Sequence, residues 1–204
     1  MLQKYDLPTI SEILIEAPTK NTWRKIVREQ VHTFWKDKLQ STASNMSTLQ
    51  FMNINMSTES HHTVRIIRNP NMTKKANVKF RLLTGTYSLQ YTRVHVYRQQ
   101  MSATCLLCKT DDETLQHFIL TCPTLNTVRE LHIHKIIGYI SHKRNTQFHL
   151  LNDHLKLHLI LDATHHCIKD LFLLKKEDVD EIEELTHNYL YALHFRTCSL
   201  LNDT

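Results

Sequence analysis

The chain has 204 residues, of which 41% are hydrophobic and 22% are charged. This length suffices for one substantial hydrophobic core or two small ones. Only two glycines and four prolines are present, which argues against the turn-rich chemistry of a many-stranded β protein. Leucine, lysine and glutamine usage favours helices. The composition therefore predicts a mainly α fold, an irregular helical domain.

Cysteine number and apolar runs restrict the cellular setting. The five cysteines are an odd number and no signal peptide precedes them, so a secreted disulfide framework is not expected. No apolar stretch approaches the roughly 18 residues that a membrane span requires. The sequence predicts an intracellular protein without a membrane partner, in either the nucleus or the cytoplasm.

Charge is unevenly distributed along the chain. Residues 1–100 carry 15 Lys and Arg against 6 Asp and Glu, whereas residues 101–204 carry 10 against 14. A basic first half favours attraction to phosphate backbones. Solvated helix faces would give the same pattern, so charge alone leaves both interpretations open.

Residues 1–70 are expected to form an N-terminal helical segment. It should contain a short helix capped by Thr9 or Ser11 and a longer helix over about 22–39. The apolar stripe of the longer helix, which is expected to face a core, consists of Trp23, Ile26, Val27, Val31, Phe34 and Trp35.

A polar connector is expected over residues 41–62, which are rich in Ser, Thr and Asn. Leu49 and Phe51 are the apolar residues that could attach it to the core. Residues 63–68 fit either a short strand or a helical turn.

Residues 71–130 combine the most basic stretch with a candidate metal site. A basic helix should end near Gly85 in a left-handed cap, because glycine adopts that conformation without a steric penalty. Ser88 is the predicted cap of a second helix. Helix, glycine corner and helix would then deliver the chain to Cys105.

A zinc knuckle is predicted at residues 105–122, inserted between helices. The pattern Cys-x2-Cys-x8-His-x4-Cys offers as ligands Cys105, Cys108, His117 and Cys122. Two cysteines in a tight turn could clamp one side of a zinc ion, and a short helix capped by Asp111 or Asp112 could close the tetrahedron. Four protein ligands leave no open position, so the pattern predicts one structural Zn²⁺. The alternative is a pair of buried thiols beside an incidental histidine.

Residues 131–204 are expected to form a C-terminal helical tail. Its best-marked element is a helix from Lys176 to about Leu201, whose early acidic residues suit the helix dipole. The acidic cluster at 177–184 is expected on the surface. The apolar stripe of this helix consists of Val179, Ile182, Leu185, Tyr189, Leu190 and Leu193.

His154 and His158 lie one helical turn apart, as a metal-binding pair would. A solvated helix face is the favoured interpretation, because no Glu completes an HExxH pattern. A metallo-hydrolase is the enzyme alternative, and it would require a nearby carboxylate and an open coordination position.

Other signatures of catalysis are missing from the sequence. There is no phosphate-binding Gly-x4-Gly-Lys loop, no GxGxxG and no GxSxG. Two-metal polymerase or nuclease chemistry needs clustered carboxylates that share ions, and the adjacent pair Asp111-Asp112 lies inside the predicted knuckle. We therefore expect a protein without enzymatic activity.

Two motifs are specific enough to suggest a family. They are Arg81-Leu-Leu-Thr-Gly-Thr-Tyr-Ser-Leu-Gln90 and Cys105-Leu-Leu-Cys108 followed by Glu113-Thr114 and His117-Phe-Ile-Leu-Thr-Cys122-Pro123. Further matches are Tyr5-Asp-Leu-Pro8, Thr22-Trp23, Phe34-Trp35 and Arg129, with a weak end pattern of Glu183, Tyr189 to Leu193, His194 and Arg196. In this order, they resemble the region downstream of the polymerase in non-LTR (LINE-type) retrotransposon reverse transcriptases.

The resemblance implies binding of the element's RNA or of target DNA during target-primed reverse transcription, with the same four residues as zinc ligands. The aromatic-x-Asp-Asp motif of the family's catalytic palm has no match here, and no endonuclease signature is present. The chain would be a remnant or separate tail of such a polyprotein. The polymerase domain of the parent polyprotein is a further expected partner.

Two hypotheses follow for function. The first is a zinc-stabilised nucleic-acid-binding module, whose expected phosphate contacts are Lys74, Lys75, Lys79, Arg81, Arg93 and Arg98. The second is a structural or protein-interaction module in which zinc only staples the fold. The second hypothesis predicts large exposed apolar patches.

Overall fold

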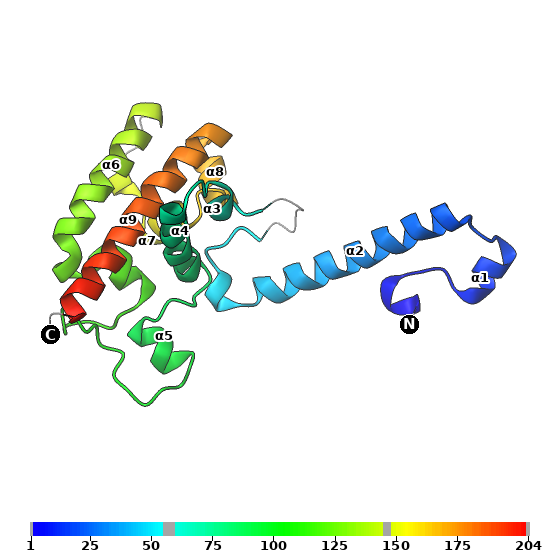
Figure 1. Cartoon of the computed structure of the whole chain (residues 1–204), viewed down its shortest axis with the longest axis horizontal. Helices are drawn as coiled ribbons and strands as arrows, with labels where there is room; N and C mark the ends of the chain where they lie inside the picture. Colours follow the sequence, from blue (N-terminus) through cyan, green and yellow to red (C-terminus); the bar gives the residue numbers. More distant parts are fainter. Residues whose placement is uncertain (1, 55–59, 145–147, 203–204) are drawn as a thin grey trace. The chain divides into compact units, whose positions relative to one another are not determined.

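The computed structural model describes residues 2–54, 60–144 and 148–202, and helices dominate them (Figure 1). The described residues contain no strand, only an isolated antiparallel bridge between Thr104 and Asp112. The predicted mainly α fold is thus confirmed. Among these helices, none combines the length and apolar character needed to cross a bilayer.

The chain divides into two compact units. The first comprises Met1–Ser47 with Ile54–Thr58, and the second comprises Thr48–Asn53 with Glu59–Thr204. Residues of the predicted segments 71–130 and 131–204 contribute to one hydrophobic core in the second unit.

The first unit contains η1 (Leu2–Tyr5), α1 (Ile10–Ile15) and α2 (Lys20–Ser44). Thr9 caps α1 as predicted, in a reciprocal capping box with Glu12. Thr19 caps α2, and none of its residues is buried. The predicted core role of its aromatic stripe is therefore wrong: the stripe has the helical period, but the first unit supplies little to cover it.

The predicted connector begins later than expected, because α2 continues to Ser44. A short 3-10 turn, η2 (Ser47–Leu49), follows, and Phe51 is buried against the rings of His154 and His158. The predicted anchoring role of Phe51 is confirmed. Residues 55–59 of the connector lie outside the described part of the chain.

Within the described residues of the second unit, three α-helices precede the knuckle: α3 (His62–Arg65), α4 (Pro70–Leu83) and α5 (Gln90–His95). Gly85 has φ 66° and follows the end of α4, as predicted. A Cβ added there would lie 2.7 Å from Thr48 Cβ, so glycine is required both by the backbone and by space. Ser88 caps nothing, because α5 begins after Leu89 without a side-chain cap.

Among the described residues that follow the knuckle are four α-helices: α6 (Asn126–Arg144), α7 (Asp153–Leu161), α8 (His166–Phe172) and α9 (Lys176–Asn202). The short turns η3 (His117–Thr121) and η4 (Pro123–Leu125) lead into α6, and η5 (Phe148–Leu150) precedes α7. Helix α9 packs against both α4 and α6 (Figure 1). Its predicted apolar stripe provides the buried core residues Val179, Ile182, Tyr189, Leu190 and Leu193.

Two side chains that were predicted to lie on the surface are buried. Glu183, in the acidic cluster 177–184, is 0% exposed, and His158 is 1% exposed. Burial lowers the pKa of His158 to about 4, so this imidazole is neutral at pH 7. The prediction fails for these two side chains because distant residues, among them Lys79 beside Glu183 and Phe51 beside His158, help to cover them. It holds for Glu177, Glu184 and His154, which are exposed.

Candidate metal centre and basic groove

The first two donors lie in a tight turn closed by the Thr104–Asp112 bridge. The N–H of Cys105 donates to the carbonyl of Asp111 at 2.8 Å, and the N–H of Lys109 donates back to the carbonyl of Cys105 at 2.9 Å. The backbone of Lys109 is in the left-handed conformation, with φ 58°. This turn reverses the chain direction and returns Cys108 toward Cys105.

A single π-helical turn, η3, brings the other two donors together. In an α-helix, residues five apart lie about 140° apart around the axis, so a His-x4-Cys pair would diverge. Here the N–H of Cys122 donates to the carbonyl of His117 at 2.8 Å, which is the i→i+5 bond of a π-helix. This wider turn places Cys122 over His117.

Thr114 caps the helical stretch that begins at Leu115 and continues into η3, and Glu113 attaches it to α5. The Thr114 hydroxyl oxygen accepts the N–H of His117 at 3.0 Å, so the predicted caps Asp111-Asp112 are wrong, and both stay exposed in the preceding loop. Glu113 Oε2 accepts the N–H of Gln90 at 2.8 Å. That hydrogen bond attaches the knuckle to the first residue of α5.

The four donor atoms, from Cys105, Cys108, His117 and Cys122, all lie within 4.8 Å of one another. Cys105 Sγ is 3.9 Å from Cys122 Sγ, and Cys108 Sγ is 3.3 Å from His117 Nε2. Zinc bonds of about 2.3 Å to sulfur and about 2.0 Å to nitrogen separate ligands by roughly 3.4–3.8 Å in a tetrahedron. This group, largely buried, can therefore hold one metal ion.

The thiols have different proton affinities. Burial raises the pKa of Cys105 and of Cys122. Burial would also raise the pKa of Cys108, but hydrogen bonds from Thr110 and from the Asp111 backbone outweigh it and lower that pKa. A cation among the three sulfurs favours all three thiolates, so metal binding should release protons.

Two side chains outside the knuckle hold its carbonyl groups. Arg129 donates from Nε to the carbonyl of Ile119 at 3.1 Å and from Nη2 to the carbonyl of Cys122 at 2.8 Å. The hydroxyl of Tyr189, in α9, donates to the same Ile119 carbonyl. The knuckle is thus bonded to α6 and α9, and the residue pattern alone gave no signal for these contacts beyond the family matches at Arg129 and Tyr189.

An open groove of about 550 Å³ runs along α4 and α9. Its lining includes Lys74 and Arg81 from the predicted basic set, with Tyr191 and His194 from α9. The guanidinium carbon of Arg81 lies 5.6 Å from the centre of the Tyr87 ring, and the Tyr87 hydroxyl lies 2.8 Å from His194 Nδ1. The buried Tyr87 thus contacts both the Arg81 guanidinium and the His194 ring, two of the groups that line the groove.

The other four basic residues predicted to contact phosphate do not line this groove. Lys75 is partly buried and donates to Asn188 Oδ1 at 2.6 Å. Arg93, in α5, donates to Gln99 Oε1 at 2.8 Å. Arg98 is exposed, with φ 52°. Lys79 does not fit the prediction, because it is 0% exposed and presents no ammonium group to a phosphate.

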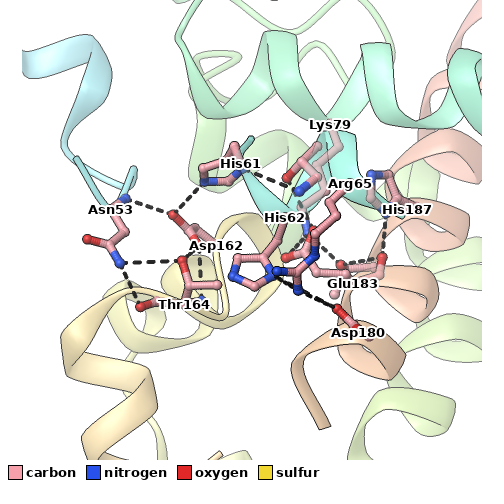
Figure 2. Close-up of polar contacts among 12 residues, drawn as sticks. Asn53, His61, His62, Arg65, Lys79, Asp162, Thr164, Asp180, Glu183 and His187 are labelled. Atoms are coloured by element: carbon pink, nitrogen blue, oxygen red, sulfur yellow. Dashed lines mark hydrogen bonds and ion pairs between the residues drawn. The ribbon is translucent and has the colours of Figure 1, made fainter. Parts of the chain in front are cut away.

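Lys79 belongs to a buried polar network between α3, α4 and α9 (Figure 2). Its Nζ lies 2.8 Å from Glu183 Oε1 and donates to the Thr186 hydroxyl at 2.7 Å. The hydroxyl of Thr63 donates to Glu183 Oε2 at 3.2 Å. His187 Nδ1 lies 2.6 Å from the backbone carbonyl of Glu183. The burial cost of each charge is thus offset by an opposite charge and by hydrogen bonds.

No protein-family model matches the chain, and neither the curated proteins nor the solved structures contain a significant match to it.

Proposed function

We propose that this chain is a zinc-stabilised nucleic-acid-binding module without catalytic activity. The observation that carries this proposal is the groove along α4 and α9, in which Lys74 and Arg81 lie with Tyr191 and His194. A phosphate backbone is recognised by clustered Lys and Arg side chains, and unpaired bases stack on aromatic rings. One groove that offers both features suits a single strand of RNA or DNA.

The metal in this proposal is zinc, bound by Cys105, Cys108, His117 and Cys122. Three sulfurs and one imidazole nitrogen are a donor set that zinc accepts, and a site with four protein ligands is structural. Its role is to hold the knuckle in shape beside α6 and α9. No coordination position remains for a substrate, which agrees with a binding module.

The resemblance to LINE-type reverse transcriptases supports the same proposal. Of its two specific motifs, one begins at the groove residue Arg81 and contains the left-handed Gly85, and the other supplies the four metal donors. We therefore propose that the chain corresponds to the region after the polymerase domain of such a polyprotein. The element RNA or the target DNA would be its ligand.

Salt-dependent binding to single-stranded RNA and DNA tests the proposal. In Lys74→Ala and in Arg81→Ala, the log–log slope of affinity against salt should flatten by about 0.7–0.9 per lost contact. Lys135→Ala is the matched control, because Lys135 is exposed on α6 outside the groove. An affinity that does not depend on salt, or equal slopes in all three variants, would contradict the proposal.

A second candidate function is protein interaction through α2. This helix buries none of its residues, and Val27, Val31, Trp35 and Leu39 line an open apolar groove along it. The expected partner is the polymerase domain of the parent polyprotein. Protein interaction would be favoured over nucleic-acid binding if the zinc-loaded protein binds that domain but binds neither RNA nor DNA. Trp35→Ser should then weaken binding to the domain.

A further inference from the structure

A second group of metal-binding side chains lies at the start of α8, outside the knuckle. The donor atoms of His165, His166 and Cys167 are all within 4.8 Å of one another. Cys167 Sγ lies 3.4 Å from His166 Nε2, and the rings of His165 and His166 have centroids 4.3 Å apart. The separation of Cys167 Sγ from His166 Nε2 is close to the one that a shared zinc ion imposes on a sulfur and a nitrogen ligand.

His165, a member of this group, and its neighbour His158 each have a buried ring nitrogen without a hydrogen-bond partner among the described residues. His158, 1% exposed, stacks on His165 with ring centroids 4.0 Å apart. In both rings, the nitrogen without a partner among the described residues is Nδ1. Buried polar nitrogens are normally satisfied, and one that is not calls for an explanation such as an unseen ion.

Asp162 stabilises the loop before α8, because both of its carboxylate oxygens have polar contacts. Asp162 Oδ1 accepts the N–H of Thr164 at 2.9 Å and its hydroxyl at 2.5 Å. Asp162 Oδ2 accepts the N–H of Asn53 at 2.7 Å and contacts His61 Nε2 at 3.2 Å (Figure 2). With both oxygens engaged, Asp162 acts as a support for the loop and not as a ligand.

We propose that His165, His166 and Cys167 bind a second zinc ion, independent of the knuckle. Two imidazoles and one thiolate suit a borderline divalent ion. With three protein ligands, one coordination position is left for water or an exogenous donor. The second ion should bind more weakly than the first, because it has one protein ligand fewer and a more exposed site.

Zinc titration of the untagged full chain tests this site. Wild type should bind two zinc ions per chain, and His166→Ala should bind one. Because His166 is exposed, its removal should leave the fold intact, which circular dichroism can verify. His134→Ala, at an exposed position of α6, is the matched control and should bind two. One zinc per chain in wild type, or two in His166→Ala, would overturn the proposal.

Cobalt supplies a second readout that identifies the thiolate. With zinc in the knuckle and one equivalent of Co²⁺ added, wild type should show thiolate-to-cobalt charge-transfer absorption. Cys167→Ser should lose this absorption, while Cys198→Ser, which changes an exposed cysteine of α9, should retain it. Equal absorption in the two variants would exclude Cys167 as a ligand.

Discussion

The knuckle at residues 105–122 and the Lys79–Glu183 network are both buried polar regions of the second unit, but they are built differently. In the knuckle, three sulfurs and one imidazole converge within 4.8 Å, and no cationic side chain is among them. In the network, the ammonium of Lys79 meets the carboxylate of Glu183 at 2.8 Å. Convergent donors without a counter-charge indicate a site for a cation, whereas a paired charge indicates a contact that holds helices together.

The two regions also differ in how far their partners are separated along the chain. All four knuckle donors fall between Cys105 and Cys122, so their spacing can be read from the sequence. In the network, the hydrogen bond from Thr63 to Glu183 spans 120 residues. Such a contact depends on how α3, α4 and α9 pack and leaves no local pattern.

The largest expected effect is on the knuckle, from Cys108→Ser or from a chelator. Zinc contributes on the order of 10–16 kcal/mol to isolated fingers, so loss of the ion should remove ordered structure mainly around residues 100–125. Amide hydrogen exchange would measure this loss, with Cys198→Ser as the control. Unchanged protection at 100–125 in metal-free protein would mean that the knuckle, like the network, is held by the protein alone.

The next effect concerns the network. Lys79→Met leaves the Glu183 carboxylate buried without its counter-charge, which should lower the free energy of unfolding by about 3–5 kcal/mol. The double variant Lys79→Met with Glu183→Leu should recover most of that loss, because no buried charge remains. Denaturant unfolding of both variants, with Lys74→Met as a surface control, would measure these changes in the free energy of unfolding. A double variant as unstable as the single one would contradict the pairing.

A pH dependence separates the network from the knuckle. Burial, and then the charge of Lys79, lower the pKa of His187 from 6.5 to about 3 in the folded state. The unfolded chain therefore binds more protons below pH 6.5, and this contribution to stability is full above 6.5 and is lost as pH falls toward 3. His187→Gln should reduce the slope of stability against pH by up to about 1.4 kcal/mol per unit.

Urea unfolding at pH 6.5, 5.5 and 5.0 would measure that difference between wild type and His187→Gln. Protonation of the knuckle thiolates changes the stability of both proteins equally, so it cancels when their pH profiles are compared. Parallel pH profiles would show that His187 is protonated as easily in the folded as in the unfolded chain.

The smallest expected effects on stability come from substitutions of the two glycines, which change no polar group and so serve as a comparison for the polar regions. Gly85→Ala should cost at least about 1–2 kcal/mol, because a left-handed residue acquires a Cβ and that Cβ would lie 2.7 Å from Thr48 Cβ. Gly138→Ala should stabilise by roughly 0.5–1 kcal/mol, because its position in α6 is open. Thermal unfolding of the two variants should shift in opposite directions, and equal shifts would contradict this assignment.

Local patterns predicted the features that local interactions create. The four metal donors, the left-handed Gly85 and the long helix α9 all have short-range causes, namely ligand spacing, a missing Cβ and a helical apolar period. The π-helical turn was not predicted, although the His-x4-Cys spacing contains its signal: residues five apart meet only when the helix is wider than an α-helix.

Features that depend on distant partners escaped prediction. Lys79 looks like its exposed neighbours in a basic stretch, and only the packing of α4 on α9 buries it against Glu183. The aromatic stripe of α2 shows the converse case, since its period is that of a core helix while none of its residues is buried. Periodicity indicates which side chains share a face, but not what covers that face.

X-ray absorption at the zinc edge would show directly whether the knuckle binds a zinc ion. The sample is the zinc-loaded His166→Ala variant, in which the second proposed site is removed. We expect one zinc per chain with three sulfur neighbours near 2.3 Å and one nitrogen near 2.0–2.1 Å. A protein that retains no zinc, or a zinc shell of nitrogen and oxygen alone, would contradict this expectation.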